Sequence, residues 1–229
     1  MITENENSGF TPSRGQLTAM VAALMFLAAC AGYMVGVRGD SEPGAGSVDV
    51  GFLHDMISHH EQALQLSTIE LNNGAEPDVK HFAREILQQQ SYEIGVMEQQ
   101  LEDWGYARAV RPETAMAWMD HAVSVTTMPG MASEDELELL GQHSGRDTDA
   151  LFIVLMQDHH LGGVHMAEYA AKHAGNGSVR ELAGRMARVQ KQEIAEMSAA
   201  RTRAQLPDKP EGWVPATIPS VDDDEHEEH

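Results

Sequence analysis

The pattern Met-x-x-His-His occurs twice in this chain of 229 residues, at 56–60 and, 100 residues later, at 156–160. A second pattern, Gln-x-x-Glu-Ile-x-x-Met, also occurs twice with the same offset, at 90–97 and 190–197. This period is longer than the units of about 20 to 50 residues from which solenoids and propellers are built. We therefore expect two homologous halves within one domain. The shared residues are mainly Met, His, Glu and Gln, which indicates a site built into the core of the domain.

The first half is predicted to be two helices joined by a tight turn. Asp49 is the expected N-cap of a helix that continues to about Leu71, with apolar residues at helical spacing. Gly74 suits the left-handed position that ends many helices, and Pro77 suits the first turn of a following helix. We expect that second helix to extend from Pro77 to about Trp104.

The second half is predicted to repeat this arrangement. Asp147 or Thr148 is the expected cap of a helix that continues to about residue 174, where Gly-Asn-Gly turns the chain. A capping box at 178–181 then predicts a final helix that ends at about residue 205.

Residues 106–146 have no counterpart in the repeat and connect the two halves. A short helix is expected at about 114–123, and a capping box at 133–136 predicts another. Four long helices in two antiparallel hairpins are typical of a four-helix bundle. No segment alternates between polar and apolar residues over a useful length. The fold class is therefore predicted to be all-α, with a duplicated bundle domain at 48–206.

Residues 17–37 form an uncharged stretch that is long enough to span the hydrocarbon core of a bilayer as a helix. We interpret it as an uncleaved transmembrane or signal-anchor helix. The alternative is a cleaved lipoprotein signal, because Leu-Ala-Ala-Cys at 27–30 resembles a bacterial lipobox and would make Cys30 the lipidated N-terminus. The flanking segments, 1–16 and 38–47, are expected to be a polar tail and a flexible linker.

Charge and composition exclude several functions. The formal net charge of −21 argues against a nucleic-acid partner, because phosphates need Lys and Arg. Cys30 is the single cysteine, which excludes disulfides within the chain and zinc sites built from cysteines. The chain has fourteen Met and twelve His but only five Phe. Any metal is therefore expected on His, Met, carboxylate or backbone groups. The acidic segment 207–229 is expected to be disordered.

The repeated residues are spaced to share helix faces. Residues three and four apart are neighbours on a helix, so Met56 lies beside His59 and His60. On the partner helix, Glu93 and Met97 lie on one face, and the same holds in the second half. Each half is thus predicted to bring together two imidazoles, two thioethers and one carboxylate. Thioether with imidazole is the ligand set that selects copper(I). The glutamate is either a ligand or a hydrogen-bond acceptor that orients a ligating histidine.

The predicted metal ligands combine both repeats with two residues found only in the second half. They are Met56, His59, His60, Glu93, Met97, Met156, His159, His160, His165, Met166, Glu193 and Met197. The alternative is a duplicated buried polar network that specifies the bundle without metal. A glycine pair at 162–163 predicts a close backbone approach in the second half. Further residues, which could form a peripheral soft-metal surface, are His54, His121, Met128, Met131 and His143.

These motifs resemble a known bacterial family, domain of unknown function 305. The resemblance rests on Phe-x-x-x-Met-x-x-His-His in both halves, on the Gln-x-x-Glu-Ile-x-x-Met partner and on Met-Pro-Gly-Met at 128–131, and it covers about 48–204. It implies a ferritin-like four-helix bundle that is exported or membrane-anchored. It also implies copper binding, because the family includes periplasmic copper-binding proteins implicated in copper resistance. The first half departs at Leu66, where the family often has Met. The family signature falls on Met56, His59, His60, Gln90, Glu93 and Met97, and on Met156, His159, His160, Gln190, Glu193 and Met197.

We therefore expect a membrane-anchored, extracytoplasmic protein that binds copper, or another transition metal ion, for buffering or delivery, and that is not an enzyme. Its expected partners are the membrane, through 17–37, and a copper-dependent membrane protein or assembly. One alternative is a metal-free structural or accessory subunit of a membrane assembly. A weaker alternative is a ferritin-like oxidoreductase with a dinuclear centre, although the Glu-x-x-His typical of such centres is absent from the bundle segment.

Overall fold

The computed structural model describes residues 13–37, 42–107 and 111–208. Most of the predicted tails at 1–16 and 207–229, and part of the predicted linker at 38–47, lie outside these ranges. Its elements in chain order are α1 (Arg14–Val37), α2 (Val48–Asn73), α3 (Pro77–Asp103), β1 (Thr114–Ala115), the 3-10 helix η1 (Ala117–Met119), β2 (Val123–Ser124), the 3-10 helix η2 (Val125–Thr127), α4 (Glu134–Gln142), α5 (Arg146–His173) and α6 (Gly177–Ala204). The all-α prediction is confirmed. Two compact units are present, Met1–Glu42 and Pro43–His229.

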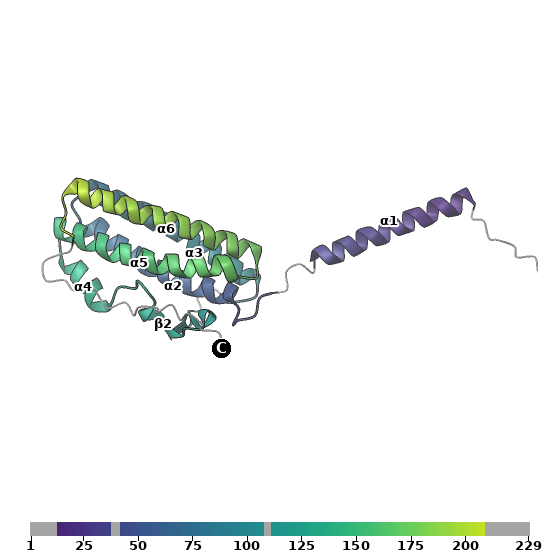
Figure 1. The fold of residues 1–229 in the computed structure, drawn as a ribbon, viewed down its shortest axis with the longest axis horizontal. Helices are drawn as coiled ribbons and strands as arrows, with labels where there is room; N and C mark the ends of the chain where they lie inside the picture. The colour runs from purple at the N-terminus through teal and green to yellow at the C-terminus, as the bar shows by residue number, and fades with distance from the viewer. Residues whose placement is uncertain (1–12, 38–41, 108–110, 209–229) are drawn as a thin grey trace, which may run out of the picture. The chain divides into compact units, whose positions relative to one another are not determined.

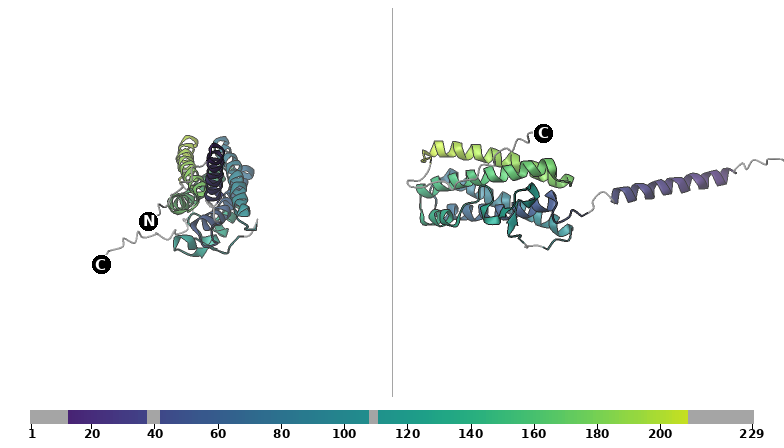
Figure 2. Two further views of the ribbon diagram at one scale, coloured as in Figure 1. Left: turned by 90° about the vertical axis from the view of Figure 1, so that its right-hand side faces the viewer. Right: turned by 60° about the horizontal axis from the view of Figure 1, so that its bottom comes forward.

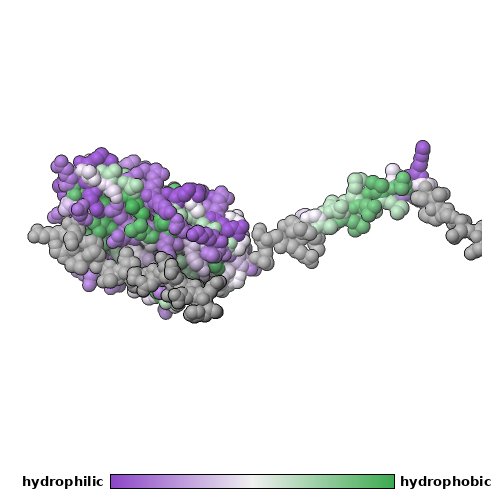
Figure 3. Space-filling view, viewed as in Figure 1, coloured by the Kyte–Doolittle hydropathy of each residue, from purple (hydrophilic) through white to green (hydrophobic). Residues whose placement is uncertain are grey.

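The first unit contains a single helix, α1. Its segment Arg14–Tyr33 is long and apolar enough to cross a membrane by length and composition. Its large apolar side chains are exposed, among them Leu24, Phe26 and Tyr33. Figure 3 shows most of the surface of the helix in green, the colour of hydrophobic residues. An apolar surface of this kind is unfavourable in water and favourable in a bilayer.

The second unit is built from two helical hairpins. Helices α2 and α3 form the first hairpin, and α5 and α6 form the second (Figures 1 and 2). Helices α2 and α5 pack against each other through the middle of the unit, whereas α3 and α6 contact each other far less. The connector between the hairpins packs on α2 and α5 through α4 and η1.

The N-caps differ from the predicted ones. Ser47, not Asp49, caps α2, since its hydroxyl accepts a hydrogen bond from the Val50 amide. Helix α5 begins after Gly145, whose φ is +64°, so neither Asp147 nor Thr148 is its cap. Helix α6 is capped by the side chain of Asn176, which precedes the predicted capping box at 178–181.

Asp49 instead closes the turn of the other hairpin. Its carboxylate oxygens accept hydrogen bonds from the amides of Gly175 and Asn176, at 2.9 and 2.7 Å. The equivalent residue in the second half, Asp149, accepts from the amides of Ala75 and Glu76 in the first hairpin's turn. The repeats therefore cap each other's turns.

Gly74 ends α2 for a reason that the sequence did not indicate. Its φ is −68°, so it does not adopt the left-handed conformation that we predicted. A Cβ at this position would collide with the carboxyl groups of Glu70 and Asp149. Glycine is required here for space and not for backbone conformation.

The connector contains less helix than predicted. Where a helix was expected at 114–123, a two-stranded antiparallel ladder, β1 with β2, encloses η1. The Asp55 carboxylate in α2 accepts hydrogen bonds from the Met116 amide and from Nε1 of Trp118, at 2.7 and 2.6 Å, which fixes this segment on the bundle. The predicted capping box at Ser133 and Glu136 is confirmed, and α4 follows it.

The bundle has two separate apolar cores. The first apolar cluster surrounds Phe52, Met97 and Trp118, and the second surrounds Leu66, Phe152 and Met197. The first cluster includes residues from the N-terminal half of α2 and the C-terminal half of α5. The second includes residues from the C-terminal half of α2 and the N-terminal half of α5, so the two clusters lie at opposite ends of the bundle. The repeated polar residues lie between them.

Candidate metal centre

A layer of polar side chains crosses the middle of the bundle, and we call it the central polar layer. Its members are His59, His60, Gln90, Glu93, His159, His160, Gln190 and Glu193. The four histidines come from the middle of α2 and α5, and each is at most 1% exposed. Polar side chains buried to this degree cost free energy unless they are hydrogen-bonded or hold a ligand.

The two repeats meet at His59 and His159. Their imidazole rings stack with centroids 3.7 Å apart and planes inclined by 32°. This pair joins α2 to α5 at the level where the two copies of the motif face each other. Both halves thus contribute to one polar layer.

Each half contains the same histidine–glutamate pair. Nε2 of His60 lies 2.9 Å from Oε2 of Glu93, and Nε2 of His160 lies 2.8 Å from Oε2 of Glu193. The glutamates therefore occupy the position of hydrogen-bond acceptors for the histidines, which is the second of the two roles that we expected for them.

The other two histidines use backbone carbonyls as acceptors. Nε2 of His159 lies 2.9 Å from the His59 carbonyl oxygen, and Nε2 of His59 lies 3.3 Å from the Pro129 carbonyl oxygen. Carbonyl and carboxylate oxygens only accept, so Nε2–H is the donor in all four rings, and in a neutral ring Nδ1 then carries the lone pair.

All four Nδ1 atoms are buried and lack a hydrogen-bond partner among the described residues. The amide oxygens of Gln90 and Gln190 in the same layer are also unpartnered there. Four imidazole Nδ1 atoms without partners, in one buried layer, are unusual because native structures satisfy most buried polar atoms. A neutral imidazole whose other N–H is held by an oxygen is also the usual form of a metal-ligating histidine.

Electrostatics keeps the stacked pair neutral. Burial lowers the pKa of His59 to about 3, and the neighbouring His60 and His160 also lower it. Burial is the main reason that the pKa of His159 lies well below its ordinary value, and His59 is the next contributor. Because metal ions bind only unprotonated imidazole, both rings are in the binding form at neutral pH.

The repeated methionines lie on either side of the layer. Met56 and Met97, from the first copy, are in the first apolar cluster, and Met156 and Met197, from the second copy, are in the second. All four are fully buried. Imidazole nitrogen with thioether sulfur on both sides is a donor set that fits copper.

The remaining predicted ligands are placed differently. His165 is exposed on α5, so the structure does not bring it to the layer, whereas its neighbour Met166 is fully buried in the first apolar cluster. Adjacent residues on a helix point in different directions, which separates this pair. Within the described ranges, no group of three or more His, Cys, Asp or Glu converges in a geometry that could hold a metal ion.

The connector closes the layer on the α2 and α5 side. A Cβ on Gly162 would collide with the Pro129 carbonyl group, and one on Gly130 would collide with the backbone of α5 near His159. The predicted close backbone approach is therefore confirmed at Gly162, whereas Gly163 lies against the side chain of Gln190. The role of Pro129 as the acceptor for His59 was not predicted. The only signal for it was Met-Pro-Gly-Met, which has no counterpart in the repeat.

The predicted peripheral surface does not form a single patch. Met128 is buried in the first apolar cluster, whereas His121 is exposed. His54 packs edge-on against Tyr106. Nδ1 of His143 lies 2.7 Å from the Leu139 carbonyl oxygen, at the C-terminal end of α4. These residues have separate structural surroundings.

Solved structures with the same fold are known. A DUF305 protein from Streptomyces coelicolor, described as secreted, is 32% identical with a TM-score of 0.66, and the match covers 75% of this chain and 100% of that one. A DUF305 fragment from Deinococcus radiodurans is 28% identical with a TM-score of 0.59, covering 68% of this chain and 96% of that one. CopM in its Cu(I)-bound form is 23% identical with a TM-score of 0.55, also covering 68% and 96%, and at this identity it shows the fold alone.

No curated protein matches the chain. The model of the family named domain of unknown function (DUF305) matches residues 49–201, which is well over half of the sequence. The chain therefore belongs to the DUF305 family.

Proposed function

We propose that this protein binds copper ions in the central polar layer, on the extracytoplasmic side of a membrane, and buffers or delivers them without catalysis. The observation that carries the proposal is the set of four buried Nδ1 atoms without partners among the described residues, each on a ring whose Nε2–H is already held by an oxygen. Such rings are oriented in advance, and His59 and His159 are also neutral, so little reorganisation is needed for binding.

The residues that would hold copper are the four histidines, through Nδ1, and the repeated methionines on either side. They are His59, His60, His159, His160, Met56, Met97, Met156 and Met197. When bound, copper(I) would supply the soft acceptor that matches thioether sulfur and imidazole nitrogen. Glu93 and Glu193 would orient His60 and His160 and increase their basicity through the Nε2–H hydrogen bonds.

Two comparisons support this proposal. CopM, which has the same fold, has been solved with Cu(I), with Cu(II) and with silver, so this fold holds copper and silver ions in that protein. The Streptomyces coelicolor relative is described as secreted, which fits an extracytoplasmic location. Helix α1 would serve as the membrane anchor, and a copper-dependent membrane protein or assembly would be the partner that exchanges copper with the bundle.

One observation favours a metal-free structural role as the second candidate. Every histidine Nε2 in the layer has an acceptor, and no three His, Cys, Asp or Glu of the described residues converge as a metal site. A buried network of this kind could specify the pairing of the hairpins without any metal. In that case, replacement of the histidines would change stability and leave metal uptake unchanged.

The test is a titration with copper(I) in competition with a chelator. The variant replaces the four buried histidines, His59, His60, His159 and His160, by Ala. The matched control removes four exposed histidines instead, His81, His121, His165 and His173. We expect tight binding by the wild type and the control and at least a hundredfold loss in the variant, since removal of metal-supporting residues typically costs about 10- to 100-fold each. Equal binding by all three proteins, with helical circular dichroism retained, would refute the proposal.

A further inference from the structure

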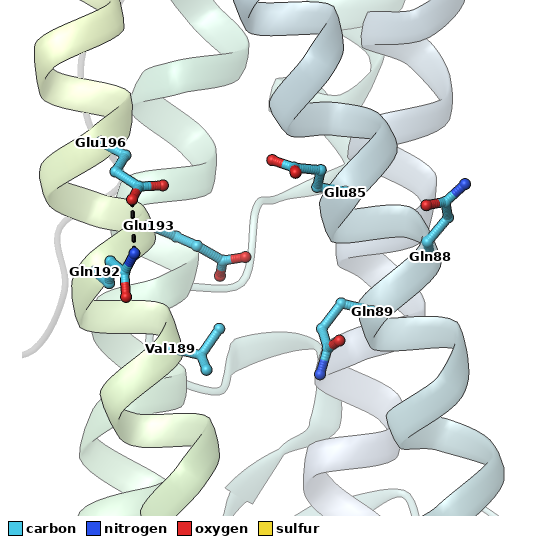
Figure 4. Close-up of a pocket in the computed structure, with 7 residues that line it drawn as sticks. All are labelled: Glu85, Gln88, Gln89, Val189, Gln192, Glu193 and Glu196. Carbon is cyan, nitrogen blue, oxygen red and sulfur yellow. Dashed lines mark hydrogen bonds between the residues drawn. The ribbon is translucent and has the colours of Figure 1, made fainter.

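A groove runs between α3 and α6, two helices that contact each other little (Figure 4). Its volume is about 470 Å³. The side chains that face it are Glu85, Gln89, Val189, Gln192, Glu193 and Glu196. Figure 4 shows Glu85 and Gln89 of α3 opposite Val189 and Glu193 of α6.

The groove is acidic. Three of its lining residues are glutamates, and none of the described ones is Lys, Arg or His. His81, which is outside the lining, lies 3.3 Å from Glu85. Glu196 accepts a hydrogen bond from the neutral amide of Gln192 at 2.7 Å. A cleft lined by charges of one sign raises the local concentration of ions of opposite sign.

The floor of the groove belongs to the central polar layer. Glu193 lines the groove and is also the acceptor for Nε2 of the fully buried His160, at 2.8 Å. On the other wall, Nε2 of Gln89 donates to Oε1 of Glu93, the acceptor for His60. The Glu193 side chain is 16% exposed and that of Glu93 is 9% exposed, so the layer is more accessible at Glu193.

Packed segments of the described residues border the layer elsewhere. The connector covers it along α2 and α5, with the Pro129 carbonyl in contact with Gly162. The two apolar clusters fill the bundle at both ends. Two further surface pockets, one lined by Tyr92 and the other by Lys172, include no residue of the layer.

We propose that the groove between α3 and α6 is the route by which a cationic metal reaches the buried imidazoles, with Glu193 at the point where the groove ends and the layer begins. This inference rests on the proposed copper-binding function. Carboxylates attract a hydrated cation but are poor ligands for a soft one, so they concentrate it without retaining it. Displacement of the Glu193 side chain uncovers His160, and the imidazoles and thioethers inside then hold the ion.

The test measures loading rates with silver nitrate as a soft, freely hydrated cation, on the full chain in detergent micelles and chloride-free buffer. After rapid mixing, a chelating resin removes free silver, and mass spectrometry quantifies the silver that the protein retains. One variant, Val189→Trp, obstructs the groove, and its control, Ala195→Trp, places the same side chain at an exposed position of α6 outside the groove lining. A second variant, Glu85→Gln with Glu196→Gln, removes two charges and leaves the layer intact.

We expect Val189→Trp to slow loading and release equally, by about tenfold, with the equilibrium affinity unchanged. The double variant Glu85→Gln with Glu196→Gln should load silver about three- to tenfold more slowly than the wild type at low salt. At high salt its loading rate should approach that of the wild type, because salt screens the attraction between the carboxylates and the cation. Identical rates for Val189→Trp and Ala195→Trp would overturn the route while leaving copper binding intact. No retention of silver by the wild type would instead refute the proposed function itself.

Discussion

Glu70 provides a quantitative test of how burial acts in this bundle. Its side chain on α2 is completely buried, and no N–H or O–H donor among the described residues reaches either carboxyl oxygen. Burial, and then the hydrogen bond to Asp149 and the charge of Asp149, raise the pKa of Glu70 from its ordinary value of 4.5 to about 9. Glu70 is therefore protonated at neutral pH and donates its proton to the Asp149 carboxylate.

The sign of the effect on stability follows from linkage. The folded state holds the Glu70 proton more tightly than the unfolded state, so the stabilisation is complete below pH 4.5 and is lost as the pH rises toward 9. Each pH unit in this window lowers the free energy of unfolding by about 1.4 kcal/mol. Between pH 4.5 and pH 7 the loss amounts to about 3 kcal/mol.

Glu70→Gln keeps the shape and an N–H donor for Asp149 but cannot ionise. We expect the free energy of unfolding of the variant, relative to the wild type, to increase by about 3 kcal/mol between pH 4.5 and pH 7. The assay is urea unfolding of Pro43–His229, a compact unit with its own cores, followed by the fluorescence of the buried Trp104 and Trp118.

Glu181→Gln, at an exposed site on α6, is the matched control for a change of one charge. Its pH profile should run parallel to that of the wild type. If the Glu70→Gln profile is also parallel to the wild type, Glu70 is ionised in the folded state and the reasoning from burial fails.

Two further predictions concern the connector and the anchor. Gly162→Ala should lower the free energy of unfolding by about 1 to 3 kcal/mol, because a Cβ there displaces the Pro129 carbonyl. At Gly184 on α6, an added Cβ would meet only side chains at ordinary contact distances, so Gly184→Ala should be neutral or stabilising by up to about 1 kcal/mol. An equal decrease in the free energy of unfolding for both variants would contradict the packing argument. The full chain should sediment with membranes after cell lysis and resist extraction by high salt and carbonate, while Pro43–His229 should remain in the supernatant. Full-length protein in the supernatant would exclude α1 as an anchor.

The sequence predicted the features that depend on local rules. Pro77 begins α3 as expected, and the capping box at Ser133 begins α4, since both act within a few residues. The duplicated His-His pattern predicted two imidazoles within each half, but it did not predict that His59 and His159 stack and so join the four imidazoles in one layer.

The predictions that were wrong or missing concern features that depend on contacts between distant segments. Asp49 was predicted as a helix cap because Asp is favourable there, yet its carboxylate binds a turn 126 residues away. The acceptor for His59 lies 70 residues away, in a connector without repeat symmetry. His165 was grouped with Met166 because the two are adjacent in sequence. Adjacent residues on a helix point in different directions, and His165 is exposed on α5. Spacing along one helix cannot specify such partners.

The reciprocal turns at Asp49 and Asp149 have a consequence for the origin and integrity of the chain. The carboxylate that binds the turn of each hairpin belongs to the other hairpin. The backbone amides of each turn therefore have these acceptors only when both hairpins are present. Two identical copies of one hairpin, related by a twofold axis, could supply the same contacts to each other. Fusion of the two copies of such a dimer would give the arrangement seen here, with the symmetry retained in the turns and the histidines and broken by the connector.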